Sequence, residues 1–108
     1  MDDGTFRLLE TMQTLAVREQ AVVSANLANA DVPGYEARAF RFREALSQAL
    51  ADGKVPTANE VGRVGEAGRS VNLEEELVDL RRVSLLSRTW SRLLSTHIRG
   101  LRAAIGSR

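Results

Sequence analysis

A proline–glycine pair in the first third of the chain limits the helix that precedes it. Pro33 and Gly34 stand directly before the aromatic residue Tyr35. Proline fixes its own φ and pushes Val32 into an extended conformation, so the helix must end just before this point. A Pro-Gly pair also fits the two central positions of a type II turn, where the second residue needs a positive φ. The sequence therefore predicts a turn segment over residues 31–39.

The helix that this turn ends is predicted over residues 5–30. Apolar side chains recur in it at intervals of three, four, five or seven, and charged residues fall largely between them. A helix of this length would extend about 39 Å. We expect three residues of the apolar stripe to pack against another helix: Leu8, Leu15 and Val22.

A second apolar stripe occupies the C-terminal third of the chain. Asn72 is a favourable N-cap, and Glu75 three residues later fits a variant of the capping box. The sequence thus predicts a C-terminal helix over residues 72–105, about 50 Å long. Acidic residues cluster at its start, and arginines are distributed over the rest of the helix. The helix dipole favours this order of charges. Its expected packing residues are Leu86, Trp90, Leu94 and Leu101.

The middle of the chain contains less apolar material. Residues 40–51 read as a short amphipathic helix that docks Phe40 and Phe42 against the long helices. Residues 52–70 contain four glycines, a proline and few sizeable apolar groups, so we expect a mobile loop there. The alternative for this stretch is a small hairpin built on its three valines, Val55, Val61 and Val64.

Together these segments predict an all-α fold in a single domain over residues 1–108. Its two long helices form an antiparallel, coiled-coil-like pair, joined by the turn, the short helix and the loop. Only five of the 108 residues are aromatic, which leaves little bulky material for a compact core. We therefore expect an extended molecule that is partly disordered alone and completes its burial in an assembly.

The residues favour no catalytic, cofactor or metal site. The chain has no cysteine and one histidine, which excludes disulfides, cysteine nucleophiles and multi-histidine metal sites. His97 lies among leucines of the C-terminal helix, where packing is its expected role. The acidic run at Glu74, Glu75, Glu76 and Asp79 reads as a helix-start cap, since consecutive helical residues point in different directions. No glycine-rich phosphate loop is present. The sequence indicates no enzyme.

The arginines of the C-terminal helix leave a second function open. Residues 80–108 hold seven arginines and no acidic residue, so this helix could bind nucleic acid or an acidic membrane surface. The more common interpretation is the solvated face of an amphipathic helix, since acids elsewhere bring the net charge to +1. A coiled-coil adaptor of unrelated lineage is a further alternative.

Two targeting signals are absent from the sequence. The N-terminal residues are acidic and lack an apolar core, so no cleavable signal peptide is predicted. No apolar run approaches the roughly 18–20 residues needed to span a bilayer, so we expect no direct membrane insertion.

The stretch around the turn resembles the N-terminal signature of the flagellar rod and hook family. That signature reads Asn-x-Ala-Asn-x-x-Thr-Pro-Gly-Tyr, and Val32 stands here in place of its threonine. Residues 71–77 and 101–105 are similar to the C-terminal helix of the family's proximal rod members, so the resemblance covers roughly residues 5–45 and 70–106. The matching signature residues are Asn26, Ala28, Asn29, Pro33, Gly34 and Tyr35.

This resemblance implies a structural subunit of the proximal rod of the bacterial flagellar basal body. Such a subunit polymerises axially into a hollow drive shaft that transmits torque from the membrane ring to the hook. Implied partners are copies of the chain itself, the rod protein FlgC and its neighbours, the adaptor FliE and the membrane ring protein FliF. The resemblance also implies a location in the periplasm, export through the flagellar type III apparatus, and no cofactor or nucleic acid.

Overall fold

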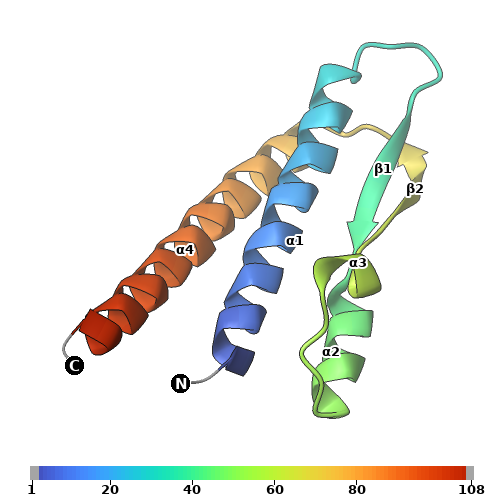
Figure 1. The fold of residues 1–108 in the computed structure, drawn as a ribbon. Helices are drawn as coiled ribbons and strands as arrows, with labels where there is room; N and C mark the ends of the chain where they lie inside the picture. Colours follow the sequence, from blue (N-terminus) through green and yellow to red (C-terminus); the bar gives the residue numbers. More distant parts are fainter. Residues whose placement is uncertain (1–2, 107–108) are drawn as a thin grey trace.

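The computed structural model describes residues 3–106, which form four helices and two strands (Figure 1). The long helices lie at the ends of the chain, as predicted, and their bounds differ from the expected ones by at most two residues. In chain order the elements are α1 (Asp3–Ala28), β1 (Glu36–Arg41), α2 (Arg43–Ala51), α3 (Ala58–Val61), β2 (Arg63–Ser70) and α4 (Leu73–Gly106).

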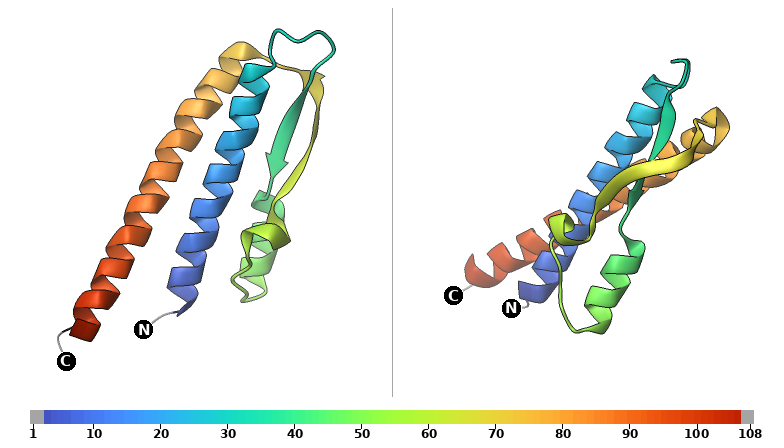
Figure 2. Two further views of the ribbon diagram at one scale, coloured as in Figure 1. Left: turned by 45° about the horizontal axis from the view of Figure 1, so that its top comes forward. Right: turned by 90° about the vertical axis from the view of Figure 1, so that its right-hand side faces the viewer.

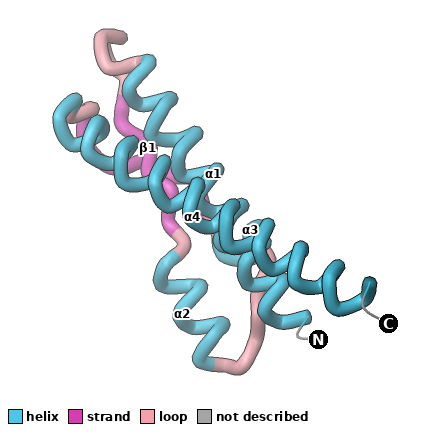
Figure 3. Tube along the Cα trace, turned by 90° about the vertical axis from the view of Figure 1, so that its left-hand side faces the viewer, coloured by secondary structure: helices cyan, strands magenta, loops and turns pink. Residues whose placement is uncertain are grey.

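The elements form three layers with α1 in the middle (Figures 1 and 2). Helix α4 runs antiparallel to α1 on one side, and the two strands with α2 and α3 lie on the other. Viewed from the α4 side, no other element lies outside α4 (Figure 3). One face of α4 therefore packs on α1, while the opposite face is open.

The prediction of an all-α fold is wrong in the middle of the chain. Strands β1 and β2 pair antiparallel, with Phe40 opposite Val64 and a register irregularity between Glu36 and Arg38. The stretch 52–70, predicted as a mobile loop, contains α3 and β2 instead. The valine hairpin is also wrong, because the partner of β2 is β1. Strand β2 is glycine-rich and mostly exposed, so pairing with a distant segment specifies it more than local propensity does.

Strand β1 also changes the predicted bounds of its neighbours. Strand β1 occupies residues that were predicted as the end of the turn segment and the start of the short helix. Helix α2 therefore begins at Arg43 and not at residue 40. The expected docking of Phe40 and Phe42 against the long helices is confirmed for α1, although both residues precede α2. Their ring centroids are 5.7 Å apart, and both pack against a buried cluster on α1, α2 and α3. The buried members of that cluster are Leu15, Leu46, Ala58 and Val61.

A strict alternation of three- and four-residue steps selects one stripe along α1 and one along α4, and we name these two stripes the α1–α4 seam. All its positions are buried or half-buried. In α1 they are Phe6, Leu9, Gln13, Ala16, Gln20, Val23 and Leu27; in α4 they are Glu76, Leu80, Val83, Ser87, Trp90, Leu94, His97 and Leu101. At the seam position Gln20, the side-chain amide donates to Ser84 Oγ at 3.2 Å, and beside the seam Arg82 pairs with Glu19 at 3.3 Å. The spacing is that of a coiled coil, but polar or small residues fill several positions.

The molecule is elongated, as predicted. Its extents are 61 × 27 × 16 Å and its radius of gyration is 16.7 Å, whereas a compact domain of this length has about 13 Å. Its accessible surface is 7365 Å², against about 5,900 Å² for a folded monomer of this mass. The excess surface agrees with a chain that leaves apolar area for neighbours.

Within residues 3–106, no helix combines the length and the apolar character that a membrane crossing requires.

Candidate functional site

The turn after α1 has the predicted geometry. The Tyr35 amide donates to the Val32 carbonyl at 3.2 Å, which closes a four-residue turn around the Pro-Gly pair. Gly34 has a φ of +79°, the positive value that the third residue of a type II turn requires. A side-chain carbon at Gly34 would meet no atom within 4 Å. Glycine is therefore needed at this position for its backbone conformation and not for space.

Asn26, just before this turn, joins three elements through one side chain. Its amide nitrogen donates to the Arg38 carbonyl at 2.9 Å and to Glu76 Oε1 at 3.1 Å. Its oxygen accepts from the Arg38 amide at 2.9 Å and from the Tyr35 hydroxyl at 3.3 Å. The residue is 1% exposed, so α1, β1 and α4 are linked through a buried side chain.

Glu76 brings a charge into the same contact. This residue is 2% exposed, and its Oε1 lies 3.7 Å from an Arg69 guanidinium nitrogen of β2. A buried carboxylate is costly unless hydrogen bonds and an opposite charge accompany it, and Asn26 and Arg69 supply both. We call this group of five residues the Asn26 hub: Asn26, Tyr35, Arg38, Arg69 and Glu76.

The Asn26 hub uses all the hydrogen-bonding capacity of the asparagine amide. An amide group offers two donor hydrogens and two acceptor lone pairs, and four contacts occupy them here. Aspartate could not replace it, because a carboxylate has no hydrogen to donate to Glu76. The chemistry of the site is thus positional: it fixes the angle at which the strands and α4 meet α1.

The other signature residues act locally. The Asn29 side chain donates at 2.8 Å to the Ala25 carbonyl, which also accepts the Asn29 backbone amide at 3.1 Å, so it reinforces the end of α1. Ala28 is the last residue of α1 and is exposed. Asn26 and Asn29 therefore stand beside the turn as expected, but only Asn26 reaches other elements.

The residues predicted for helix packing lie on two different faces. Leu15 is fully buried, but it belongs to the cluster beneath α2 and α3 and not to the α1–α4 seam. Leu8 and Val22 are half-buried and lie seven residues from Leu15, on the same side of α1. On α4, Trp90, Leu94 and Leu101 are half-buried in the seam, whereas Leu86 is 37% exposed on the outward side.

Sequence reasoning missed three members of the Asn26 hub. Arg38 takes part through its backbone groups, and Arg69 lies in the predicted loop, so neither carried a local signal. Glu76 was grouped with the acids that start α4. A signal was available, because Glu76 lies at a seam position, seven residues before Val83, where a charge needs a partner.

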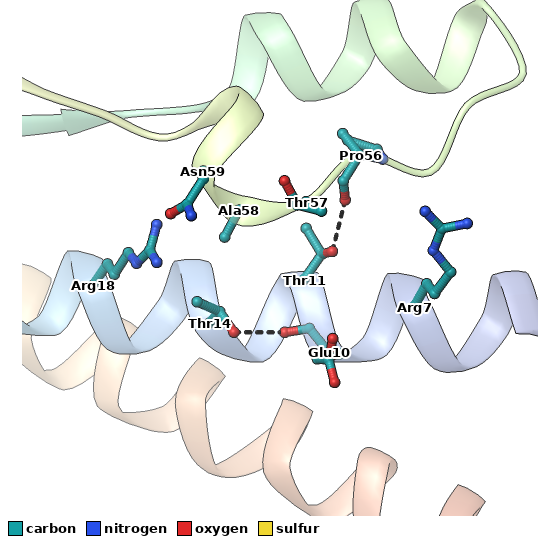
Figure 4. A pocket seen from close by; sticks show the side chains of 9 residues that line it. All are labelled: Arg7, Glu10, Thr11, Thr14, Arg18, Pro56, Thr57, Ala58 and Asn59. Atoms are coloured by element: carbon teal, nitrogen blue, oxygen red, sulfur yellow. Dashed lines mark hydrogen bonds between the residues drawn. The ribbon is translucent and has the colours of Figure 1, made fainter.

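Two polar hollows lie beside α1. One, of about 200 Å³, separates α1 from the segment that leads into α3, with Arg7 and Arg18 at its two ends (Figure 4). Thr11 of α1 is buried beside this hollow, and its Oγ1 donates to the Pro56 carbonyl of the facing segment at 2.7 Å. The other, of about 140 Å³, adjoins Asn26 and includes Val22 in its lining. Among the described residues, no three acidic, histidine or cysteine side chains gather to hold a metal ion.

The arginines of α4 line a separate side of the helix. Arg81, Arg88, Arg92, Arg99 and Arg102 are exposed, and within residues 3–106 none of them forms an ion pair. Arg82 differs, because it pairs with both Glu19 and Asp79. Arg108, the last arginine of the predicted stripe, lies outside the described residues.

Comparison with known proteins finds similarity in the segment that contains Asn26 and Tyr35. A family model described as "Flagella basal body rod protein" matches residues 9–35, which is most of α1 and the turn up to Tyr35. The chain is 35% identical over 71 residues to the flagellar basal body rod protein FlgB of Yersinia ruckeri, covering 66% of this chain and 45% of that protein. The match to FlgB of Escherichia coli K12 is 36% over 56 residues, covering 52% and 41%.

A third relative, FlgB of Proteus mirabilis strain HI4320, is 33% identical over 74 residues, covering 68% of this chain and 47% of that protein. The chain thus spans somewhat less than half the length of the curated relatives that it matches. The matches agree with the resemblance seen in the signature residues, and they leave no support for a coiled-coil adaptor of unrelated lineage. Over these stretches the chain is similar to flagellar basal body rod proteins.

Proposed function

We propose that this chain is a structural subunit of the proximal rod of the bacterial flagellar basal body. It polymerises axially and forms part of the hollow shaft that transmits torque from the membrane ring to the hook. The proposal rests above all on one observation: residues 9–35 match the rod family, and that segment contains Asn26, whose side chain holds the layers of the fold together.

The shape of the molecule supports a role in assembly. Large apolar side chains remain exposed along α4, and few apolar side chains are fully buried. Burial of apolar surface contributes about 25 cal/mol per Å², so a contact of a few hundred Å² supplies several kcal/mol before the costs of association. A subunit with many neighbours gains stability from such contacts that it lacks alone.

The proposed role is non-catalytic and needs no cofactor. Its partners are other copies of the chain, the rod protein FlgC and its neighbours, the adaptor FliE and the membrane ring protein FliF. The subunit is exported through the flagellar type III apparatus, and it resides in the rod within the periplasm. Nucleic-acid binding through the α4 arginines is the weaker alternative, because the relatives named above are rod proteins.

Deletion of the gene in its own bacterium tests this function directly. Basal bodies purified from the deletion strain and imaged by electron microscopy should show membrane rings without a rod. Complementation with the wild-type gene should restore rods and swimming, which excludes effects on neighbouring genes. Intact rods and normal swimming in the deletion strain would refute the proposal.

A further inference from the structure

Four exposed arginines form a straight row along one side of α4. They follow one another at steps of seven, four and seven residues, which return to the same side of a helix. The row covers about five turns, or 27 Å, of α4. Within residues 3–106 none of the four forms an ion pair. We name this row the arginine stripe: Arg81, Arg88, Arg92 and Arg99.

No acidic residue of α4 stands where it could pair with the stripe. The positions three and four residues from each stripe arginine, where ion pairs form along a helix, hold no aspartate or glutamate. Arg88 and Arg92 are themselves four residues apart, a spacing at which like charges destabilise a helix. The isolated chain therefore bears a repulsion that a neighbouring row of carboxylates would turn into attraction.

Leu85 protrudes beside the stripe and is 64% exposed. Arg81, Arg88 and Arg92 are four, three and seven residues away from it, so they are its neighbours on the helix surface. Arginine is enriched at protein interfaces, and a large exposed apolar side chain adds area that a partner can bury. This composition indicates a binding surface and not merely a solvated side of the helix.

The surroundings of the stripe favour an acidic protein over other polyanions. The phosphates of a nucleic acid would pair with the arginines, but they offer nothing apolar to Leu85. An anionic bilayer is broad, so it would also meet Glu74, which is exposed and lies seven residues before Arg81 on the same side of α4. A single helix is narrow enough to follow the stripe and end before Glu74, and it can carry carboxylates and apolar side chains together.

Another copy of this chain does not offer the required surface. Of the four acidic residues of α4, all but Glu74 already lie within ion-pair distance of arginines. On α1, Glu19 pairs with Arg82. No helix among residues 3–106 therefore presents a row of unpaired acids at steps of seven and four. The complementary surface belongs to a different protein.

We propose that the arginine stripe binds an acidic helix of a different protein, a neighbour of this chain in the assembled rod. The partner helix carries carboxylates level with the stripe and an apolar side chain against Leu85. Because the steps of the stripe read seven, four and seven in both directions, a helix of either orientation fits. Charge complementarity of this kind selects the partner and speeds the encounter. The inference rests on the proposed function, because it gives the chemistry of one neighbour of the proposed rod subunit.

Photo-cross-linking in assembled basal bodies tests the chemistry of the partner. The deletion strain is complemented with the chain carrying benzoylphenylalanine in place of Leu85, purified basal bodies are irradiated, and mass spectrometry identifies the attached peptide. A second strain carries the cross-linker at Thr89, exposed one turn later, so that the test does not depend on one bulky replacement. In the control strain the cross-linker replaces Leu50, an exposed leucine of α2.

The expected product joins residue 85 or 89 to an acidic segment of another protein, and the Leu50 strain does not yield that product. Attachment to a second copy of this chain, to a neutral or basic segment, to lipid or to nucleic acid would overturn the inference and leave the proposed function intact. Rods that form without any product, or with the same peptide captured at residue 50, would overturn it as well. Rods in the uncomplemented deletion strain would refute the proposed function itself.

Charge reversal gives a second test without a cross-linker. Arg88→Glu combined with Arg92→Glu should abolish swimming, whereas Arg88→Lys combined with Arg92→Lys should preserve it. The reversed chain keeps a like-charge pair at the same spacing, so the urea midpoint of the purified chain should not change. Arg43→Glu, at an exposed position of α2, is the control and should leave swimming unchanged. Normal swimming by the doubly reversed chain, or an equal loss from Arg43→Glu, would overturn the role of the stripe.

Discussion

At the scale of single residues, the fold depends most on a buried side chain that carries no charge. Asn26 satisfies the backbone groups of Arg38 and the carboxylate of Glu76 at once, with all four contacts between 2.9 and 3.3 Å. Unpaired buried polar groups cost about 1–3 kcal/mol each, and charged groups cost more. The Asn26 side chain therefore stabilises the contacts of α1 with both β1 and α4.

We predict that Asn26→Ala destabilises the chain by about 3 kcal/mol, because it leaves the Arg38 backbone groups and Glu76 without their partner. The measurement is the urea concentration at which half of the helical circular dichroism signal is lost. Asn29→Ala is the control, since it removes one hydrogen bond to a carbonyl at the end of α1. If both alanine variants lowered the urea midpoint equally, the Asn26 hub would contribute no more stability than the single side-chain hydrogen bond of Asn29.

The turn gives a second prediction at this scale. Gly34→Val should impair rod assembly, because a β-branched residue resists a positive φ and the type II turn needs one. Swimming in soft agar by the complemented deletion strain measures the effect. Gly106→Val, a change at the last described helical residue, is the control. Normal swimming by Gly34→Val would mean that the turn geometry is dispensable.

His97 provides a prediction of opposite sign. Its Nε2 is buried without a hydrogen-bond partner among the described residues, and its ring lies 6.4 Å from that of Phe6. Replacing an unsatisfied polar group in a helix seam with an apolar one of similar size removes a desolvation cost. We expect His97→Leu to stabilise the chain by about 1 kcal/mol, seen as a higher urea midpoint. A lower midpoint would reveal a partner for His97 that only the assembly or water supplies.

At the scale of the elements, the two long helices and the turn followed from local patterns. Proline, glycine and the capping residues act within a few positions, so their effect is readable in the sequence. The Glu75 amide, for example, donates to Asn72 Oδ1 at 3.1 Å, as the predicted cap requires. The strands did not follow, because the pairing of β1 with β2 joins segments that are more than twenty residues apart.

Gly100 allows a prediction about α4 as an element. Glycine inside a helix costs about 1 kcal/mol relative to alanine, and there is open space for the added carbon. Gly100→Ala should therefore increase the helical signal of the purified chain and raise its urea midpoint by a corresponding amount. Val83→Ala, at a fully buried seam position, should lower both and serves as the opposite control. A fall in stability for Gly100→Ala would show that α4 is not a regular helix at this point.

At the scale of the whole molecule, the core is small for the surface that surrounds it. The fully buried apolar residues among those described are mainly leucine, valine and alanine on one side of α1 and in the seam. Large apolar side chains stay exposed along α4. This balance agrees with the expectation that stability is completed by neighbouring copies.

We predict that the isolated chain unfolds over a broad temperature range at micromolar concentration. The helical signal should increase as the concentration rises, since association buries the outward face of α4. Circular dichroism melts at several concentrations, with sedimentation to establish the monomeric state, provide the measurement. A sharp, concentration-independent transition of the monomer would contradict the expectation of an assembly-dependent fold.

The sequence by itself determined the parts of this protein that depend on neighbouring residues. These parts are the two amphipathic helices, the turn at Pro33 and Gly34, the cap at Asn72 and the signature that resembles the flagellar rod proteins. The tertiary structure alone decided which face of α1 meets α4, that β1 pairs with β2, and that Asn26 reaches Glu76. The reason is physical: periodicity reveals that a face is buried, but not against which partner. A glycine-rich strand or a buried amide acquires its role only when distant groups supply its hydrogen bonds.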